Sequence, residues 1–153
     1  MKLRSLGLVA MLVTSPAYAD EAMTVAQDIV SKWETAYNNG DAATVAALYT
    51  QDAVWVRPTG IEKGKAEIEK AVANLMKQSP KLAVSAVGAQ QNGNVVWYYS
   101  NYIFRNGPTG HTGVTLVNDA GSWHIAMHTT TTEAIRPRLL QLGYAPSVTH
   151  DDI

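Results

Sequence analysis

The stretch WETAYNNGDAATVAALYTQDAVWVRPTG, residues 33–60, carries most of the signals that decide the fold of this chain. A helix ends at the sequence NNG, where Gly40 suits a left-handed cap, and Asp41 then caps a second, short helix. The segment DAVWVRP that follows has the composition of a strand and stops at Pro58. Arg57, directly before that proline, is therefore at the position where the last inward-pointing side chain of the strand is expected.

The elements on either side of this stretch define the fold class. Apolar residues recur at helical spacing over residues 23–39, and KAEIEKAVANLMKQ, residues 65–78, predicts a third, amphipathic helix. Four strands follow in hairpin succession, KLAVSAVGAQ, VVWYYSNYIF, HTGVTLV and WHIAMHTTTT, with turns such as QNGN between them. Helices segregated from antiparallel strands predict an α+β domain in which the helices pack on one face of a curved sheet.

The first 19 residues have the pattern of a cleavable export signal. Lys2 and Arg4 precede the apolar run LGLVAMLV, and AYA at residues 17–19 fits the small-x-small cleavage rule. We therefore expect cleavage after Ala19 and a periplasmic or secreted protein that has no membrane contact afterwards. An uncleaved N-terminal membrane anchor is the alternative.

Composition narrows the classes of partner. Loss of residues 1–19 leaves 10 Lys and Arg against 13 Asp and Glu, a net charge of −3, and no Lys/Arg cluster, so we expect no nucleic-acid partner. The chain has no cysteine, which excludes a disulfide framework and thiol chemistry. The remaining length suits one domain, predicted over residues 20–132, followed by a C-terminal extension over residues 133–153 with one short helical piece.

The spaced elements of residues 33–60, the glycine and helix after them, and GSWHIAMHT near the end of the sheet resemble the nuclear transport factor 2-like (NTF2-like) superfamily. Within it, the pattern is most similar to the SnoaL-like and ketosteroid isomerase-like group. The similarity covers about residues 23–132 and implies a cone-shaped fold with three N-terminal helices on a curved antiparallel sheet. This fold carries isomerases, cyclases, dehydratases and non-catalytic domains, so the resemblance leaves the function open.

The resemblance also indicates which chemistry is missing. In the steroid isomerases, a carboxylate base precedes the Pro-x-Gly turn, whereas this chain has Arg57, which is always charged. The position of the oxyanion-binding tyrosine holds Trp33, and the second oxyanion donor, a carboxylic acid, falls near Gly113. Because all three parts are replaced, we do not expect ketosteroid isomerase chemistry.

Strand alternation sorts the candidate site residues by face, because neighbours point to opposite sides. If Arg57 points inward, so does Trp55. On the last strand the resemblance places His124, Ala126, His128 and Thr130 inside, and by the same matching Tyr98, Ser100 and Tyr102 face a cavity while Trp97, Tyr99 and Asn101 face out. The predicted lining is Trp33, Tyr37, Trp55, Arg57, Tyr98, Tyr102, His111, His128 and Thr130.

Aromatic walls with a few convergent polar groups are typical of a small-molecule site. The guanidinium of Arg57 would hold a carboxylate or another planar anion through two parallel hydrogen bonds. His128, expected to titrate near neutrality, is the candidate acid or base.

Each of these assignments has a structural alternative. Arg57 could instead pair with Glu62 or Glu34, the two tryptophans could be core fillers, and His128 could be a satisfied buried histidine. A metal site is not expected, because residues 124 and 128 lie about 13 Å apart along a strand. No motif for a cofactor or a nucleophilic serine occurs.

The opposite face of the sheet is expected to carry Trp123, Ile125 and Met127 beside the aromatics of the third strand. Left exposed, they would form an apolar patch too large for a monomer, which predicts a homodimer through this face. In the alternative, residues 135–144 fold back over it.

Three functions remain open from the sequence. The first is an exported domain that binds a small organic molecule, anionic or carbonyl-bearing, in an aromatic pocket anchored by Arg57, with little or no catalysis. The second is a SnoaL-like cyclase, dehydratase or isomerase that uses His128 as general acid/base. The third is a homodimeric structural module whose cavity is filled by its own side chains.

Overall fold

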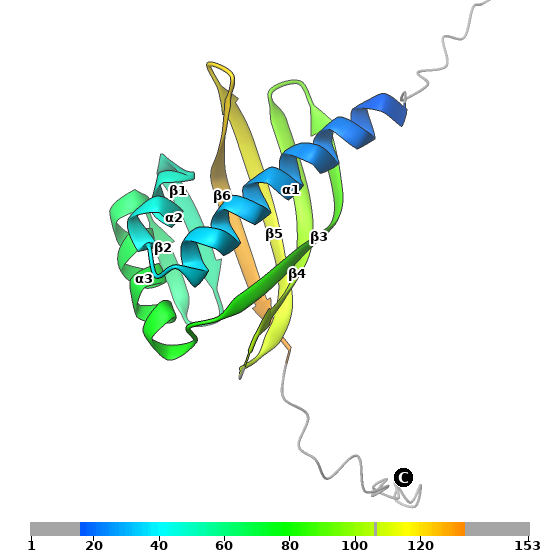
Figure 1. Ribbon diagram of the computed structural model, residues 1–153. Coiled ribbons are helices and arrows are strands. Elements are labelled where there is room, and N and C mark those ends of the chain that lie inside the picture. The colour runs from blue at the N-terminus through cyan, green and yellow to red at the C-terminus, as the bar shows by residue number, and fades with distance from the viewer. Residues whose placement is uncertain (1–15, 106, 134–153) are drawn as a thin grey trace, which may run out of the picture.

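The computed structural model describes residues 16–105 and 107–133, with side chains from residue 20 onward. Three helices pack on one face of a six-stranded, curved and unclosed sheet of order β2-β1-β6-β5-β4-β3 (Figure 1), which confirms the predicted α+β fold class. In chain order the elements are α1 (Pro16–Asn38), α2 (Ala42–Ala47), β1 (Tyr49–Arg57), β2 (Gly60–Lys63), α3 (Lys65–Gln78), β3 (Leu82–Asn92), β4 (Val95–Phe104), β5 (Thr109–Asp119) and β6 (Ser122–Thr132).

The sheet is antiparallel except at one place. β1 runs parallel to β6, so the pairing of these two strands brings the first and last parts of the sheet together. β2, which sequence reasoning treated as a loop, forms a short antiparallel hairpin with β1. Its sequence GIEK is too short and too polar to give a strand signal on its own.

The junction between α1 and α2 follows the predicted chemistry. Gly40 adopts a φ of +76°, which an L side chain disfavours, and its N–H donates to the carbonyl of Tyr37 at 3.0 Å. Asp41 then caps α2 by accepting the backbone N–H of Thr44 at 2.9 Å. α1 itself begins at Pro16, ahead of the predicted cleavage point.

Burial along β4 alternates strictly. Tyr98, Ser100 and Tyr102 are buried under the helices, whereas residues 97, 99 and 101 are exposed on the opposite face. The predicted phase of this strand is confirmed. It decides which aromatic rings reach the interior.

The phase of β6 is predicted correctly only in its second half. The pairing with β5 shifts between Thr115 and Leu116, which oppose Met127 and Ile125, so Ala126 is an extra residue in a β-bulge. For residues that precede the bulge, the side chains point to the face opposite to the predicted one. Ile125 is therefore 1% exposed in the core, and Trp123 packs against that core. The expectation that Trp123 and Ile125 lie on the outer face is wrong, and Met127 alone of the three is exposed there.

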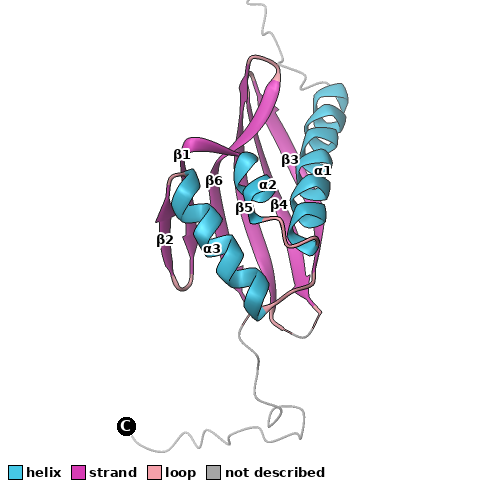
Figure 2. Cartoon of the chain, turned by 60° about the vertical axis from the view of Figure 1, so that its left-hand side comes forward, coloured by secondary structure: helices cyan, strands magenta, loops and turns pink. Residues whose placement is uncertain are grey.

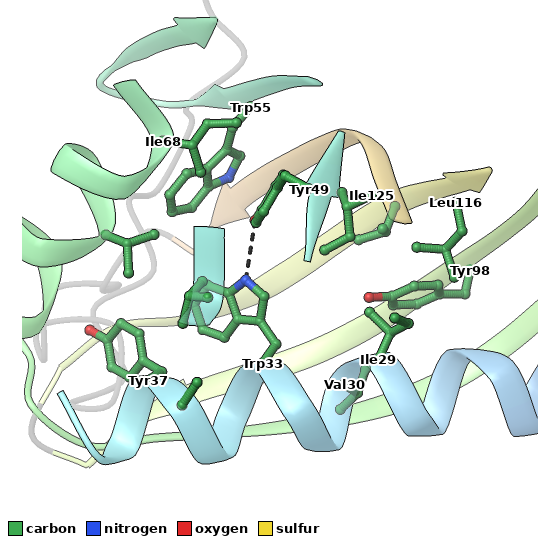
Figure 3. Close-up of a cluster of buried hydrophobic side chains, with 14 of the residues drawn as sticks. Ile29, Val30, Trp33, Tyr37, Tyr49, Trp55, Ile68, Tyr98, Leu116 and Ile125 are labelled. Carbon is green, nitrogen blue, oxygen red and sulfur yellow. Dashed lines mark hydrogen bonds between the residues drawn. The ribbon is translucent and has the colours of Figure 1, made fainter. Parts of the chain in front are cut away.

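One hydrophobic core joins the helices to the sheet (Figure 3). Ile29 and Trp33 of α1, Tyr49 and Trp55 of β1 and Ile68 of α3 are all buried in it. In the view of Figure 2, α1 lies over β3 and β4, α3 lies near β1 and β2, and the short α2 lies between α1 and α3. Within the described part of the chain, no helix is long and apolar enough to cross a membrane.

Candidate functional site

A cavity of about 300 Å³ lies between α1, α3 and the concave face of the sheet. Its lining comes from α1, α3 and every strand except β2, so the whole domain is needed to enclose it. Seven of the nine residues predicted to line a cavity do line it: Trp33, Trp55, Arg57, Tyr98, Tyr102, His128 and Thr130.

The other two predicted residues lie elsewhere. Tyr37 is 1% exposed behind Trp33, stacked on it with ring centroids 5.1 Å apart, and its hydroxyl donates to the carbonyl of Ser79 at 2.6 Å. His111 is exposed on the outer face of β5, where its Nδ1 lies 2.8 Å from the side-chain oxygen of Asn101. Tyr37 therefore braces α1 against the end of α3, and His111 belongs to the surface.

The sheet wall of the cavity is built in cross-strand rows. Tyr98, Val114, His128 and Trp55 pair in succession across β4, β5, β6 and β1, so they lie side by side. The next inward row toward the open end brings together Ser100, Thr112 and Thr130, all of which line the cavity. The Thr129–Thr132 run of β6 is thus divided by strand alternation, and its even-numbered members face the cavity.

Arg57 lines the cavity and also forms the ion pair with Glu62 that the sequence offered as the alternative. Its guanidinium forms two hydrogen bonds with the carboxylate of Glu62 on β2, one of them from Nε to Oε2 at 3.0 Å, and it also lines the cavity. Its Cζ lies 4.7 Å from the ring centroid of Trp55. Because the pair is mostly shielded from water, with 19% and 17% of the side chains exposed, the Glu62 charge balances that of Arg57 at the cavity wall.

His128 is enclosed by aromatic rings. Its imidazole is parallel to the Trp55 indole, with centroids 5.0 Å apart and planes 9° apart, and it meets Trp33 edge-on at 6.4 Å. Burial, and secondarily the positive charge of Arg57, lowers the pKa of His128 to about 3. The expectation that His128 titrates near neutrality is therefore wrong: the ring is neutral at neutral pH.

A buried hydrogen-bond chain connects α1 to His128. The Trp33 Nε1–H donates to the hydroxyl of Tyr49 at 3.1 Å (Figure 3), and the same hydroxyl lies 2.8 Å from Nδ1 of His128. Burial raises the pKa of Tyr49 far above its ordinary value, so this phenol keeps its proton. Sequence reasoning did not name Tyr49, because the pattern placed it at the end of the second helix, whereas the structure places it at the start of β1.

Neutral groups, hydroxyls and the amide of Gln78, supply the rest of the polar lining. The Trp55 Nε1–H donates to Oγ1 of Thr130 at 2.8 Å, and the Tyr102 hydroxyl donates to the carbonyl of Thr131 at 3.0 Å. Tyr98 points from the sheet into the interior (Figure 3), burial raises the pKa of its phenol, and its hydroxyl has no hydrogen-bond partner among the described residues.

Carboxylates are missing from this lining: within residues 16–105 and 107–133, no Asp or Glu lines the cavity. The same described ranges contain no group of three or more His, Cys, Asp and Glu side chains placed to hold a metal ion. The polar side chains available to a bound molecule are therefore hydroxyls, the amide of Gln78, an imidazole and a guanidinium.

Three N-terminal helices on a curved sheet, with a cavity between them, define the NTF2-like superfamily, and solved structures with this fold match the chain. The model of the SnoaL-like domain matches residues 30–133, so the chain belongs to the SnoaL-like domain family. Membership fits a ligand-binding or isomerase-like role.

Similar solved structures share the fold at low sequence identity. A ketosteroid isomerase-like protein from Erwinia carotovora atroseptica is 21% identical, with a TM-score of 0.62, over 77% of this chain and 99% of its own. An NTF-2 like protein from Shewanella oneidensis is 16% identical, with a TM-score of 0.59, over 70% of this chain and 96% of its own. A domain with a cystatin-like fold from Nostoc punctiforme is 15% identical, with a TM-score of 0.63, over 85% of this chain and 86% of its own. No curated protein matches the chain.

Proposed function

We propose that this protein binds a small organic molecule in the cavity between α1, α3 and the sheet, with little or no catalysis. The molecule has an apolar, flat body and one carbonyl or anionic group directed toward the polar part of the wall that includes Arg57. The observation that carries this proposal is a cavity of about 300 Å³ walled by aromatic rings, with a guanidinium in the lining. Ligand sites begin at about this volume, so a cavity filled entirely by the protein's own side chains is disfavoured.

The same lining argues against acid–base catalysis. A general base must hold a lone pair near the reacting proton and be unprotonated at working pH, and a general acid must carry a proton it can give up. A guanidinium offers no lone pair that could accept a proton, and the pKa of His128 near 3 keeps that ring from supplying a proton. With a pKa of about 3 the neutral His128 ring is a weak base, and no carboxylate in the described lining can replace it in the isomerase-like alternative.

The test uses three probes with the same naphthalene body and different head groups: 2-naphthoate, 2-acetylnaphthalene and 2-ethylnaphthalene. Isothermal titration and thermal shift are measured on the protein and on the Arg57→Ala variant. The control is Lys70→Ala, which removes a positive charge from the exposed face of α3. We expect at least one oxygen-bearing probe to bind, and Arg57→Ala to weaken that binding while Lys70→Ala does not. The proposal fails if no probe binds, or if Arg57→Ala binds as tightly as the unmodified protein.

We propose a homodimer through the outer face of the sheet as the quaternary state. The support is a set of large apolar side chains that are each more than 40% exposed there: Val87, Trp97, Tyr99, Ile103 and Met127. An exposed apolar patch of this kind is more often an interaction surface than a surface that stays in contact with water. Of the residues predicted for this face, Trp97, Tyr99 and Met127 remain, whereas Trp123 and Ile125 do not.

We also propose that the chain is exported and cleaved after Ala19. The support is the sequence pattern of the first 19 residues. Cleavage there would leave α1 to start at Asp20 and would keep the buried residues that the structure describes on this helix, from Ala22 onward. Mass spectrometry of the protein from a periplasmic extract gives the N-terminus directly, and a full-length mass would overturn this proposal.

A further inference from the structure

The direction of the buried hydrogen-bond chain fixes where the proton of His128 lies. The indole N–H of Trp33 can only donate, so the Tyr49 oxygen accepts from it. Tyr49 is completely buried, and its own proton needs an acceptor. Among the described residues, the acceptor within hydrogen-bond distance is Nδ1 of His128, at 2.8 Å. A proton on Nδ1 would instead leave the phenolic O–H buried without a partner.

A neutral imidazole whose Nδ1 accepts carries its proton on Nε2. The nearest partner of Nε2 is Oγ1 of Thr130, at a long 3.5 Å, and that oxygen already accepts the Trp55 Nε1–H at 2.8 Å. The protein therefore leaves the Nε2–H poorly satisfied, on a ring that lines the cavity. Because Thr130 accepts from Trp55, its own hydroxyl proton is also free to donate.

Charge balance at the wall separates neutral from anionic ligands. Glu62 accepts two hydrogen bonds from Arg57, so an anion that approached the guanidinium would meet a carboxylate already bound to it. His128 contributes no positive charge. A neutral acceptor escapes the repulsion from Glu62 and can still use the two free donors beside it.

We propose that the Nε2–H of His128 and the hydroxyl of Thr130 donate hydrogen bonds to a neutral carbonyl oxygen on a flat ligand, such as that of an aryl ketone. Tyr49 and Trp33 are positioning residues that hold His128 in the required tautomer. This inference rests on the proposed function, because it names the class of molecule that the same cavity takes.

The tautomer is tested without any ligand. Long-range proton–nitrogen spectra of the ¹⁵N-labelled full chain distinguish a protonated ring nitrogen from an unprotonated one. We expect the His128 signals to show a proton on Nε2 and a hydrogen-bonded lone pair on Nδ1. In Tyr49→Phe, which removes the hydroxyl and keeps the ring, the preference for that tautomer falls. Tyr37→Phe, which removes another buried hydroxyl from a different partner, leaves it unchanged. A proton on Nδ1 in the unmodified protein overturns the inference, whatever the variants do.

The ligand class is tested with the three naphthalene probes. We expect 2-acetylnaphthalene to bind about tenfold or more tightly than either 2-naphthoate or 2-ethylnaphthalene. Tyr49→Phe lowers the affinity for the ketone and leaves that for 2-ethylnaphthalene unchanged, which a general loss of packing would not do. Trp33→Phe removes the first donor of the chain and also changes one ring of the cavity wall, so the affinity for the ketone falls more than that for 2-ethylnaphthalene. This variant serves if Tyr49→Phe does not fold.

The outcomes separate this inference from the proposed function. Tighter binding of 2-naphthoate than of the ketone overturns the inference and leaves the binding function standing. If none of the three probes binds, the proposed function and the ligand class fall together. The nitrogen spectra still decide the tautomer in that case.

Discussion

Trp55 and His128 form a parallel stack, with ring centroids 5.0 Å apart, and the guanidinium of Arg57 lies 4.7 Å from the same indole. One aromatic ring thus connects the cation at the end of β1 with the imidazole in the middle of β6. The positive charge of Arg57 and the burial of the stack both oppose a proton on His128. The chemistry of the cavity depends on this arrangement more than on any single side chain.

The stability of the protein is expected to fall as the pH drops below about 6.5. The pKa of His128 is about 3 in the folded chain and near 6.5 when unfolded, so between these values the unfolded state binds a proton that the folded state does not. This difference in proton binding lowers the free energy of unfolding by up to about 1.4 kcal/mol for each pH unit. Urea unfolding at pH 7, 6 and 5 measures it. His128→Asn keeps an acceptor for Tyr49 and lacks the titration, so its pH dependence is weaker, and parallel curves for the two proteins would contradict the prediction.

The hydrogen bond from Trp55 Nε1 to Thr130 Oγ1 is expected to couple the two residues energetically. Trp55→Phe removes the donor. Thr130→Val removes the acceptor and leaves the N–H of Trp55 buried without a partner, which is expected to lower the free energy of unfolding by about 1–3 kcal/mol. The double variant loses less than the sum of the two, by about 0.5–1.5 kcal/mol. Free energies of unfolding from urea titrations give this difference directly. Additive losses would show that the contact contributes nothing.

Removal of the Glu62 charge is expected to change which head group the cavity prefers. In Glu62→Gln the guanidinium of Arg57 keeps its charge without a carboxylate beside it, so binding of 2-naphthoate strengthens by about tenfold. The affinity for 2-acetylnaphthalene stays within about twofold. Calorimetric titration of both probes measures the change, and Glu69→Gln on the exposed face of α3 is the matched control. An unchanged ratio of affinities in Glu62→Gln would contradict the charge-balance argument.

Gly110 marks a place where β5, β6 and a cavity ring come too close for a side chain. A Cβ there would lie 2.0 Å from the carbonyl oxygen of Thr131 and 2.7 Å from the hydroxyl of Tyr102. Gly110→Ala is therefore expected to lower the free energy of unfolding by about 3 kcal/mol or more, because backbone has to move. Gly93→Ala, at a turn with open space around it and a φ of +59°, costs about 1–2 kcal/mol. Equal losses in the two variants would show that the strand spacing at Gly110 adjusts freely.

The outer apolar face is expected to control the oligomeric state. Light scattering coupled to gel filtration gives a dimer mass for the unmodified protein. Tyr99→Lys with Met127→Lys gives a monomer, because two buried positive charges in each copy oppose association. Circular dichroism checks that the variant stays folded. A monomer mass for the unmodified protein at micromolar concentration would contradict the proposed dimer.

Local rules predicted much of this architecture from the sequence. The NNGD junction between α1 and α2 and the alternation of β4 are confirmed, because each depends on neighbouring residues alone. The inward row that contains Tyr98 and His128 followed from the same alternation, combined with the resemblance of the chain to its superfamily.

What the sequence could not reveal arises from pairing between distant segments. The bulge at Ala126 is visible only once β5 and β6 are aligned, and it moves Ile125 from the surface to the core. The depressed pKa of His128 results from burial among rings that α1 and β1 bring to β6, and secondarily from the charge of Arg57. The expectation of an ordinary value was reasonable for an isolated side chain and wrong in the fold. The ion pair of Arg57 with Glu62 was predicted only as an alternative to a cavity role, whereas the hairpin geometry of β1 and β2 allows both.

The parallel pairing of β1 with β6 sets the order in which this domain can assemble. Tyr49 and His128 are 79 positions apart, so their contact waits until almost the entire domain has left the ribosome. High contact order of this kind slows folding, because a long loop must close before the strand pairing can stabilise the chain. The cavity is consequently expected to form last in the nascent polypeptide. A chain truncated after β5 would lack the stack of Trp55 and His128 in its wall.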